Sequence, residues 1–364
     1  MNPFARRQRR ALCAVVALPF AMATMSVMSA APARAGCDLC AIYTGALLQR
    51  DRTGIFLGLS EQYTDFSTIR EGTSEVANPG QEWMGSSTTQ VMAGYAFTPW
   101  MGLQLNLPLI HREYRRLEEG MPVRGDVGGL GDLSVVGRFT PVSRAVGEVL
   151  FHVEMLAGIK APTGDSDLLA EEMGGHHEEE EEHHDDGGHE HALRAGGQGV
   201  PASPGRGAAH EGHHHEGAIH GHDLALGTGS WDGIFGTRLY ASWKRLFAQV
   251  SLQYIVRGNG DFGYEYADFF SWEAGPGLYL VAGGDWTTSL RLVTSGEKKG
   301  RDHQGGSLVD ATAVNRVYVG PGLWLTWADR MSGELTVDLP VYQDVTGRQI
   351  SPDYRLRAGL NWRF

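Results

Sequence analysis

The chain has 364 residues and a formal net charge of −12 at pH 7, and its acidity is local. Residues 171–223 alone hold 13 acidic residues against 2 arginines. The 50 glycines are about twice the ordinary usage, which favours turns and small barrel positions over helices. No nucleic-acid partner is expected.

Residues 1–35 are predicted to be a secretory signal peptide. An apolar run over 11–28 follows an arginine-rich start, and Ala33-Arg34-Ala35 is an A-x-A cleavage site. A lipoprotein signal cut before Cys37 is an alternative, but Arg34 stands where an aliphatic residue is expected. Paired arginines at the start also resemble a twin-arginine signal; an ordinary secretory signal fits better.

Residues 36–52 form a short segment before the first predicted strand. Cys37 and Cys40 predict a local disulfide in an oxidising compartment, or a metal site that would need two further ligands. Covalent haem attachment needs histidine after Cys40, and Ala41 stands there. No later apolar run reaches the ~20 residues of a membrane helix. The mature protein is therefore periplasmic, secreted or an outer-membrane β-barrel.

From residue 53 onward the chain divides into about twelve strand-length segments of alternating polarity, typical of β-strands. The last is the clearest, with Tyr354, Leu356, Leu360 and Trp362 opposite arginines and a terminal Phe364. The same alternation recurs in chain order near residues 55–59, 91–97, 101–109, 131–139, 149–160, 235–244, 249–257, 278–280, 286–292, 316–327 and 334–341.

The connections alternate between short turns and long polar joints, which indicates an outer-membrane barrel. An even strand count places both termini in the periplasm. Aromatic residues near both ends predict two interfacial girdles. We therefore predict an all-β fold over 53–364: an antiparallel up-and-down β-barrel of about twelve strands in the outer membrane. A periplasmic β-sandwich is the alternative. The predicted girdles comprise Phe97, Trp100, Trp243, Phe247, Trp286, Trp327, Trp362 and Phe364 at one end, and Tyr63, Phe66, Trp231, Tyr254, Tyr264, Phe269, Phe270 and Trp272 at the other.

The face opposite the apolar one carries more basic than acidic residues. These charges either pair across a plugged lumen or form a mildly cationic pore that favours anions. The predicted inward cations are Arg138, Lys160, Arg238, Arg257, Arg291, Arg316, Arg355, Arg357 and Arg363, and the predicted carboxylates are Asp132, Glu154, Glu273, Glu334 and Asp338.

Residues 166–225 are predicted to be a low-complexity loop rich in histidine and glutamate, inserted in the barrel and extracellular. The segment lacks apolar periodicity, so it cannot offset its ordering entropy and is expected to be disordered. Imidazoles and carboxylates suit zinc, copper or nickel, and histidine protonation below pH ~6.5 should release the metal. A solvated, shielding loop is the alternative. The predicted metal ligands are His176, His177, His183, His184, His189, His191, His210, His213, His214, His215, His220 and His222.

No enzymatic activity is expected. Ser230, Asp232 and a loop histidine could suggest a hydrolase triad, but they lie beside a flexible loop without a nucleophile elbow. No cofactor is required, although the loop can bind zinc, copper or nickel. His111, His152 and His303 are expected to be polar lumen or loop residues.

Three runs resemble a bacterial outer-membrane family whose members are labelled "putative MetA-pathway of phenol degradation" or "transporter". They are Gly129-Leu130-Gly131-Asp132, the run 158–165 ending in Pro162-Thr163-Gly164-Asp165, and Leu226-Gly227-Thr228-Gly229-Ser230-Trp231-Asp232. Gly275-Pro276-Gly277-Leu278 and the Cys37–Cys40 start are also similar. The resemblance implies a monomeric outer-membrane barrel that passes small molecules; the phenol label is not carried over as an activity.

Together these features predict an outer-membrane channel or transporter for small solutes, with an extracellular histidine-rich loop that binds divalent metal. A non-conducting structural or shielding barrel is the alternative, and a soluble periplasmic metal binder is a third. The expected partners are outer-membrane lipid, divalent metal ions and, through the C-terminal strand, the barrel-assembly machinery. A monomer is expected.

Overall fold

The computed structural model describes residues 53–176, 217–328 and 330–364. Strands account for most of the described residues, and only short helical segments interrupt them. In chain order the elements are β1 (Gly54–Gly72), β2 (Ser74–Val76), β3 (Trp83–Thr98), β4 (Met101–Glu118), β5 (Met121–Leu130), β6 (Ser134–Val146), β7 (Val149–Lys160), η3 (Asp167–His176), α2 (Gly221–Leu224), β8 (Asp232–Trp243), β9 (Leu246–Val256), η4 (Asp261–Gly263), β10 (Tyr264–Glu265), β11 (Phe269–Gly283), β12 (Trp286–Lys299), β13 (His303–Gln304), β14 (Ser307–Leu308), β15 (Val314–Trp327) and β16 (Met331–Arg363).

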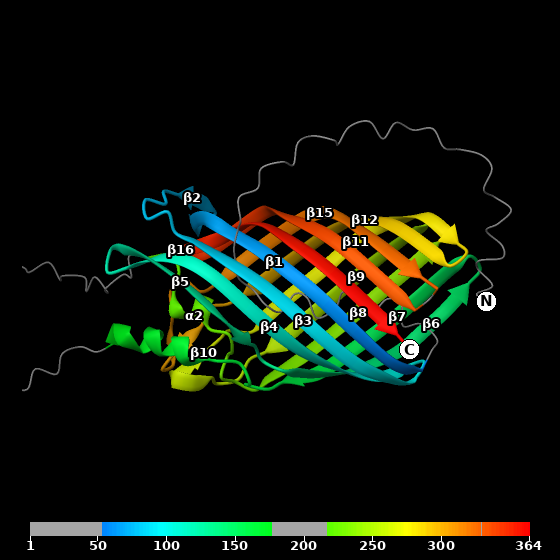
Figure 1. Cartoon of the computed structure of the whole chain (residues 1–364), viewed down its shortest axis with the longest axis horizontal. Coiled ribbons are helices and arrows are strands. Elements are labelled where there is room, and N and C mark those ends of the chain that lie inside the picture. The colour runs from blue at the N-terminus through cyan, green and yellow to red at the C-terminus, as the bar shows by residue number, and fades with distance from the viewer. Residues whose placement is uncertain (1–52, 177–216, 329) are drawn as a thin grey trace, which may run out of the picture.

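Antiparallel pairing closes these strands into a ring (Figure 1), which confirms the predicted barrel. Among the described residues the ring runs β16-β15-β12-β11-β9-β8-β7-β6-β4-β3-β1 and closes by pairing of β16 with β1. β2 and β5 pair with β1 and β4 outside the ring, and β10, β13 and β14 form a small separate sheet.

β16 turns back on itself and provides two walls of the ring. Its residues 331–345 pair with β15, whereas 348–363 pair with β1. Gly347 has φ 61° at the turn between these halves, a backbone conformation that glycine adopts without strain. The Arg363 amide donates to the Arg330 carbonyl at 2.8 Å, so both ends of β16 meet. Counted as crossing segments, the ring therefore agrees with the predicted number of about twelve.

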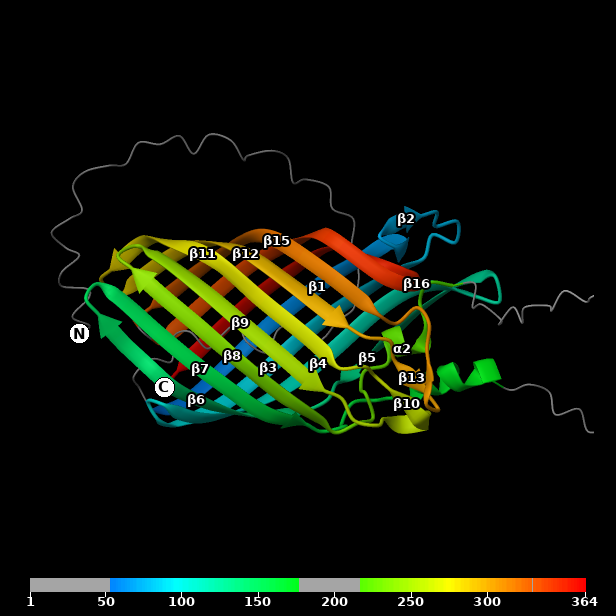
Figure 2. The same cartoon turned by 180° about the vertical axis from the view of Figure 1, so that it is seen from behind.

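The two ends of the barrel differ (Figures 1 and 2). The turn end carries two-residue turns such as Pro99-Trp100 and Gly284-Asp285, and the Phe364 amide donates to the Ile55 carbonyl there. The loop end carries β2, η3, α2, β10 and β13. At this end, β4 and β5 continue as a hairpin outside the ring, in which residues 109–118 pair with 121–130.

The outer surface of the barrel is apolar, as period-two alternation dictates. Ile55, Leu57 and Leu59 are between 44 % and 52 % exposed, while Ser60, Gln62 and Thr64 of the same strand point inward and are buried. A ring that presents such a band outward can satisfy every strand hydrogen bond within itself, as a membrane-spanning sheet requires. None of the helices in the described part of the chain is long and apolar enough to cross a membrane.

Aromatic residues at the turn end are mostly exposed, as predicted for a membrane interface. Phe97, Trp100, Trp286 and Phe364 are each at least 49 % exposed. Four residues predicted for the girdles do not lie at the membrane interface, because their side chains point inward or are covered at the loop end. They are Phe66, Phe247, Tyr264 and Phe269, all buried.

Candidate functional site

The lumen has two unlike walls. β1, β3 and the turn-end half of β4 contribute uncharged polar side chains, whereas β6, β7, β8, β11, β12, β15 and β16 contribute charged ones. The buried side chains of the neutral wall include Ser60, Gln62, Thr64, Ser86, Thr88, Gln90 and Asn106. All of the predicted inward cations lie inside the barrel, and these charged side chains are mostly buried.

The charges of the second wall form pairs, some between neighbouring strands and others between strands further apart in the ring. Glu154 binds Arg238 at 3.2 Å and Arg138 at 3.6 Å. Glu273 binds Arg291 and Arg357, and Arg357 also binds Asp338 at 2.8 Å. Buried charges in a lumen are tolerated when they are paired in this way. The geometry therefore favours the paired lumen over a ring of free cations.

Two acidic residues of this network were missing from the prediction. Asp232 binds Lys160 and Arg257, each at 2.8 Å. Glu297 binds Arg355 at 3.1 Å and Arg316 at 3.4 Å. Glu297 and Arg291 are an even number of positions apart in β12, so both side chains point into the lumen. The alternation along this strand could therefore have predicted Glu297.

Two cavities lie in the lumen, and the cluster formed by Glu297, Arg316, Tyr318 and Arg355 contributes to the lining of both. The upper one, at the loop end, has a volume of about 170 Å³ and is lined by Arg316 among others; the lower one has a volume of about 50 Å³ and is lined by Glu297 and Arg355. The Tyr318 hydroxyl donates to Glu297 at 2.9 Å, and the Arg355 guanidinium lies 4.4 Å from the Tyr318 ring centroid. Of these four side chains, Arg316 lines the upper cavity and the other three line the lower one.

The upper cavity is capped by residues 217–228, which fold inward at the loop end; we call this segment the plug. Ala218, Ile219 and Leu224 are buried against apolar residues of the wall. Two backbone contacts fix its start: the Ala218 amide donates to Glu82 Oε2 at 2.8 Å, and its carbonyl accepts from the Ile350 amide at 3.1 Å. The wall residues of this apolar cluster are Phe66, Ile69, Met84 and Ile350.

The plug and η3 correct the expected extent of the histidine-rich loop. Residues 167–173 and 217–225 belong to the predicted loop 166–225, yet Leu169, Ile219 and Leu224 are buried. The segment as a whole has few apolar residues, but those at its two ends are buried and order the chain there. Arg116 binds Glu171 at 2.8 Å and fixes η3 to β4.

The three motif runs of the family resemblance meet at one carboxylate. Asp132 Oδ1 accepts from the amides of Thr163 and Gly164, and Asp132 Oδ2 accepts from the Thr228 amide at 2.9 Å. Lys160 binds the same carboxylate at 2.5 Å. A Cβ on Gly227 would lie 2.5 Å from the Gly164 carbonyl oxygen, so both runs require glycine to approach. The motifs anchor the end of the plug to the barrel wall.

Ser230 and Asp232 belong to this anchor. The Ser230 hydroxyl donates directly to Asp232 at 2.7 Å, and Asp232 is also bound by Lys160 and Arg257. A triad instead places an imidazole between the hydroxyl and the carboxylate. The arrangement is that of a strand-end ion-pair cluster.

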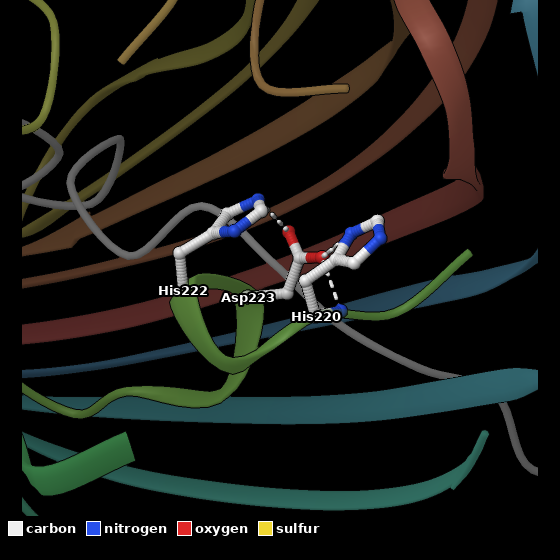
Figure 3. A group of neighbouring side chains, drawn as sticks. All are labelled: His220, His222 and Asp223. Atoms are coloured by element: carbon white, nitrogen blue, oxygen red, sulfur yellow. Dashed lines mark hydrogen bonds and ion pairs between the residues drawn. The ribbon is translucent and has the colours of Figure 1, made fainter. Parts of the chain in front are cut away.

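His220, His222 and Asp223 form the one group of metal-ligand type found among the described residues (Figure 3). One ligand atom from each lies within 4.8 Å of the others. Asp223 lies between the two rings, with Oδ1 3.6 Å from His222 Nε2 and Oδ2 3.8 Å from His220 Nδ1. The Asp223 carboxylate also accepts from the His220 amide at 3.1 Å.

Glu172 of η3 holds the His222 ring from the other side. Its Oε1 lies 2.9 Å from His222 Nδ1 and accepts from the His222 amide at 3.0 Å. Burial alone would lower the pKa of His222, but the carboxylates of Asp223 and Glu172 outweigh it and raise that pKa to about 9. Burial would raise the pKa of Glu172, but His222 outweighs it and lowers that pKa to about 2.

Of the twelve predicted ligands, the structure brings His220 and His222 together. The backbone of His176 ends η3, and the nine from His177 to His215 lie outside the described residues, as do Cys37 and Cys40. Sequence reasoning missed Asp223 and Glu172 as site residues. The adjacency His-x-His-Asp was a usable signal for Asp223; Glu172 lies 50 positions from His222 and had none. His111 is exposed, whereas His152 is a buried lumen residue and His303 is half-buried in β13.

The closed ring, apolar exterior and polar lumen define a β-barrel of the outer-membrane type. No family model matches the sequence, and a search of curated proteins finds no match. Among solved structures, the chain is similar to an outer-membrane channel from Pseudomonas putida F1, with a TM-score of 0.58 and 11% identity over 88% of this chain and 99% of that one. This likeness supports the fold.

Two autotransporter domains are less similar. The transport unit of AIDA-I from Escherichia coli has a TM-score of 0.39 and 8% identity, over 89% of this chain and 94% of that one. The β domain of BrkA from Bordetella has a TM-score of 0.38 and 11% identity, over 86% of this chain and 100% of that one. At these TM-scores, neither likeness carries an argument about function.

Proposed function

We propose that this protein is an outer-membrane channel for small solutes, and that its histidine-rich segment binds divalent metal at the mouth. The observation that carries the channel is the lumen: uncharged polar side chains line part of its wall, charged pairs line the rest, and two cavities lie within it. A barrel needed only as an anchor could fill its interior with apolar side chains. A wettable interior serves a solute path.

The orientation follows from the barrel type. Outer-membrane barrels place short turns in the periplasm and long loops outside. On that rule the turn end, with Phe364, is periplasmic, and the plug and histidine-rich segment are extracellular. The remaining expectations belong to this proposal: cleavage after Ala35, a monomer, insertion by the barrel-assembly machinery through the C-terminal strand, and membership of the barrel family that the motifs resemble.

The metal role rests on composition and on the His220–His222–Asp223 group. Many histidines close together hold metal by high local concentration even when each site is weak. We expect a variant with Gln at all ten histidines from His176 to His215 to lower the zinc, copper or nickel content of cells. Unchanged content would refute a physiological metal role.

A second candidate is a non-conducting surface barrel, and the Glu297 cluster favours it. Arg316, Arg355 and Tyr318 all bind Glu297, where the linings of the two cavities meet. A lumen held shut by paired charges passes no ions.

Single-channel recording in planar bilayers separates the candidates. The channel predicts discrete current steps from the purified, folded protein, altered by added zinc. Glu297→Gln removes the carboxylate charge that balances Arg316 and Arg355. The substitution should therefore shift the reversal potential in a KCl gradient toward that of chloride. Glu148→Gln, at an exposed turn position, is the matched control and should leave selectivity unchanged. An electrically silent wild type and Glu297→Gln would refute the channel and support the surface barrel.

A further inference from the structure

We propose that His220, His222 and Asp223 form one defined divalent-metal site inside the barrel mouth, with Glu172 as the partner that orients His222. The inference deepens the proposed metal binding of this segment and rests on it. It adds a site with three named ligands, set apart from the many histidines between residues 176 and 215.

The orientation of His222 is the first support. Its Nδ1 lies 2.9 Å from Glu172, which leaves Nε2 to face Asp223 at 3.6 Å. Histidines that bind metals commonly donate their other ring N–H to a carboxylate, which fixes the ring and raises its basicity. Glu172 is itself held in η3 beside a buried Leu169, so this support does not depend on a surface side chain.

The backbone supplies the second support. His220 precedes α2 and His222 lies within it, so one turn of chain places both rings beside Asp223. The rings are nearly parallel, with centroids 5.3 Å apart and an interplanar angle of 13°. Ligands about 2.0–2.2 Å from one ion lie ~3.3 Å from each other. His222 Nε2 lies 3.6 Å from Asp223 Oδ1, and His220 Nδ1 lies 3.8 Å from Asp223 Oδ2. The three ligand atoms lie within 4.8 Å of one another, so they must move closer to share one ion, and Asp223, at 28 % side-chain exposure, has room to adjust.

Charge balance is the third support. Glu172 and Asp223 carry two negative charges, which a divalent cation with two neutral imidazoles would cancel. The neighbouring cations are already engaged: Lys299 binds Asp302 at 2.8 Å, and Arg316 binds Glu297. The two carboxylates can therefore compensate the charge of a buried dication.

The ligand set indicates the metal and its exchange. Two imidazoles and a carboxylate suit Zn²⁺, with Cu²⁺ and Ni²⁺ as competitors. Three protein ligands leave a coordination position open to water or solute. His222 and Asp223 line the upper cavity, so that position can face the solute path. We infer an exchangeable site of cargo type, in contrast to a closed structural site.

The test isolates this site within the full chain. The ten histidines from His176 to His215 are replaced by Gln, and binding of Co²⁺ is followed by its visible d–d absorption and by equilibrium dialysis. One equivalent should remain, with a spectrum typical of four-coordinate cobalt. Zn²⁺ should displace it.

Matched variants on this background assign the ligands. His222→Gln and Asp223→Asn should each weaken Co²⁺ binding at least tenfold, while His303→Gln, on a half-buried histidine in β13, should not. Glu172→Gln should weaken binding about 10- to 100-fold, the cost of removing such a carboxylate partner. Retained heat-modifiable gel mobility shows that each variant still forms the barrel.

The outcomes separate this inference from the proposed function. Loss of all Co²⁺ binding in the folded ten-histidine variant, or equal binding after His222→Gln, would overturn the inner site. Wild-type conductance and wild-type metal stoichiometry would stand independently of that result. Conversely, a wild type that binds no more metal than the ten-histidine variant would refute the outer loop as a metal binder and leave the inner site intact.

Discussion

At the scale of single residues, the ion pair between His222 and Glu172 joins two segments that are 50 positions apart. Each partner is poorly solvated, so each relies on the other for its charge. This contact links α2 to η3 and thereby holds the plug to the wall of the barrel. Its strength depends on the protonation of both groups.

The pair predicts a pH window for docking of the plug in the metal-free protein. The pKa of His222 is raised from 6.5 to about 9, so its contribution is complete below pH 6.5 and is lost as pH rises through about 9. The pKa of Glu172 is lowered from 4.5 to about 2, so its contribution is complete above pH 4.5 and is lost as pH falls through about 2. Docking should be strongest between pH 4.5 and 6.5.

Hydrogen exchange with a chelator present, corrected for the intrinsic rate at each pH, checks this window at residues 218–225. Protection should fall between pH 7 and pH 10. In His222→Gln the fall above pH 7 should vanish. Protection that stays flat in the wild type across this range would contradict the role of the pair.

At the scale of elements, the plug is held chiefly by a small apolar cluster. Ile219 is 3 % exposed and Leu224 is fully buried. Removing such a side chain from a packed site costs about 2–5 kcal/mol. Because only a few buried apolar side chains dock the plug, we expect the loss of one of them to release it.

Ile219→Asn is therefore predicted to undock the plug and leave the barrel intact. Single-channel conductance should rise, and amide protection over 217–228 should fall. Leu308→Asn is the matched control, because Leu308 lies at the same end and is 59 % exposed. Conductance equal to that of the control would show that the plug does not obstruct the path.

The elements also show what the sequence could predict. Period-two alternation predicted the strands and the inward cations correctly, because lipid outside and polar lumen inside impose opposite demands on alternate residues. Phe247 was misassigned as an interfacial residue although it shares the inward phase of Gln249 and Ser251. Aromatic character suggested an interfacial position, whereas the alternation along β9 places the Phe247 side chain inside the barrel.

The candidate site was predictable only in part, for a different reason. His220 and His222 were identified from composition, but composition does not distinguish them from the other ten. What sets them apart is burial beside Glu172, and that contact joins η3 to α2 across the insert. No local sequence pattern predicts which apolar residues at the ends of a polar segment will be buried against the barrel wall.

At the scale of the whole molecule, the ring depends on one long-range pairing. β1 and β16 join the first and last described strands, with Leu59 opposite Leu360. The other ring pairings connect strands that follow each other along the chain. The β1–β16 seam is therefore the contact that completes the barrel.

A disulfide tests the register of the seam. Leu59→Cys with Leu360→Cys, in a background lacking Cys37 and Cys40, should cross-link in the folded protein, because paired Cα atoms lie ~4.5–5.5 Å apart. A shifted mobility after boiling, on a non-reducing gel, measures it. Leu59→Cys with Leu335→Cys should not cross-link, because Leu335 belongs to the other half of β16. Cross-linking of the second pair in place of the first would contradict the register.

The plug lies against this seam. Its apolar partners Phe66 and Ile69 come from β1, Met84 from β3 and Ile350 from β16. Phe66 and Met84 face each other in the β1–β3 pair, but Ile350 joins them only after the C-terminal half of β16 has paired with β1. During assembly the plug thus has no complete docking surface until the ring is shut. We therefore expect the plug to dock last, once the wall of the barrel is complete.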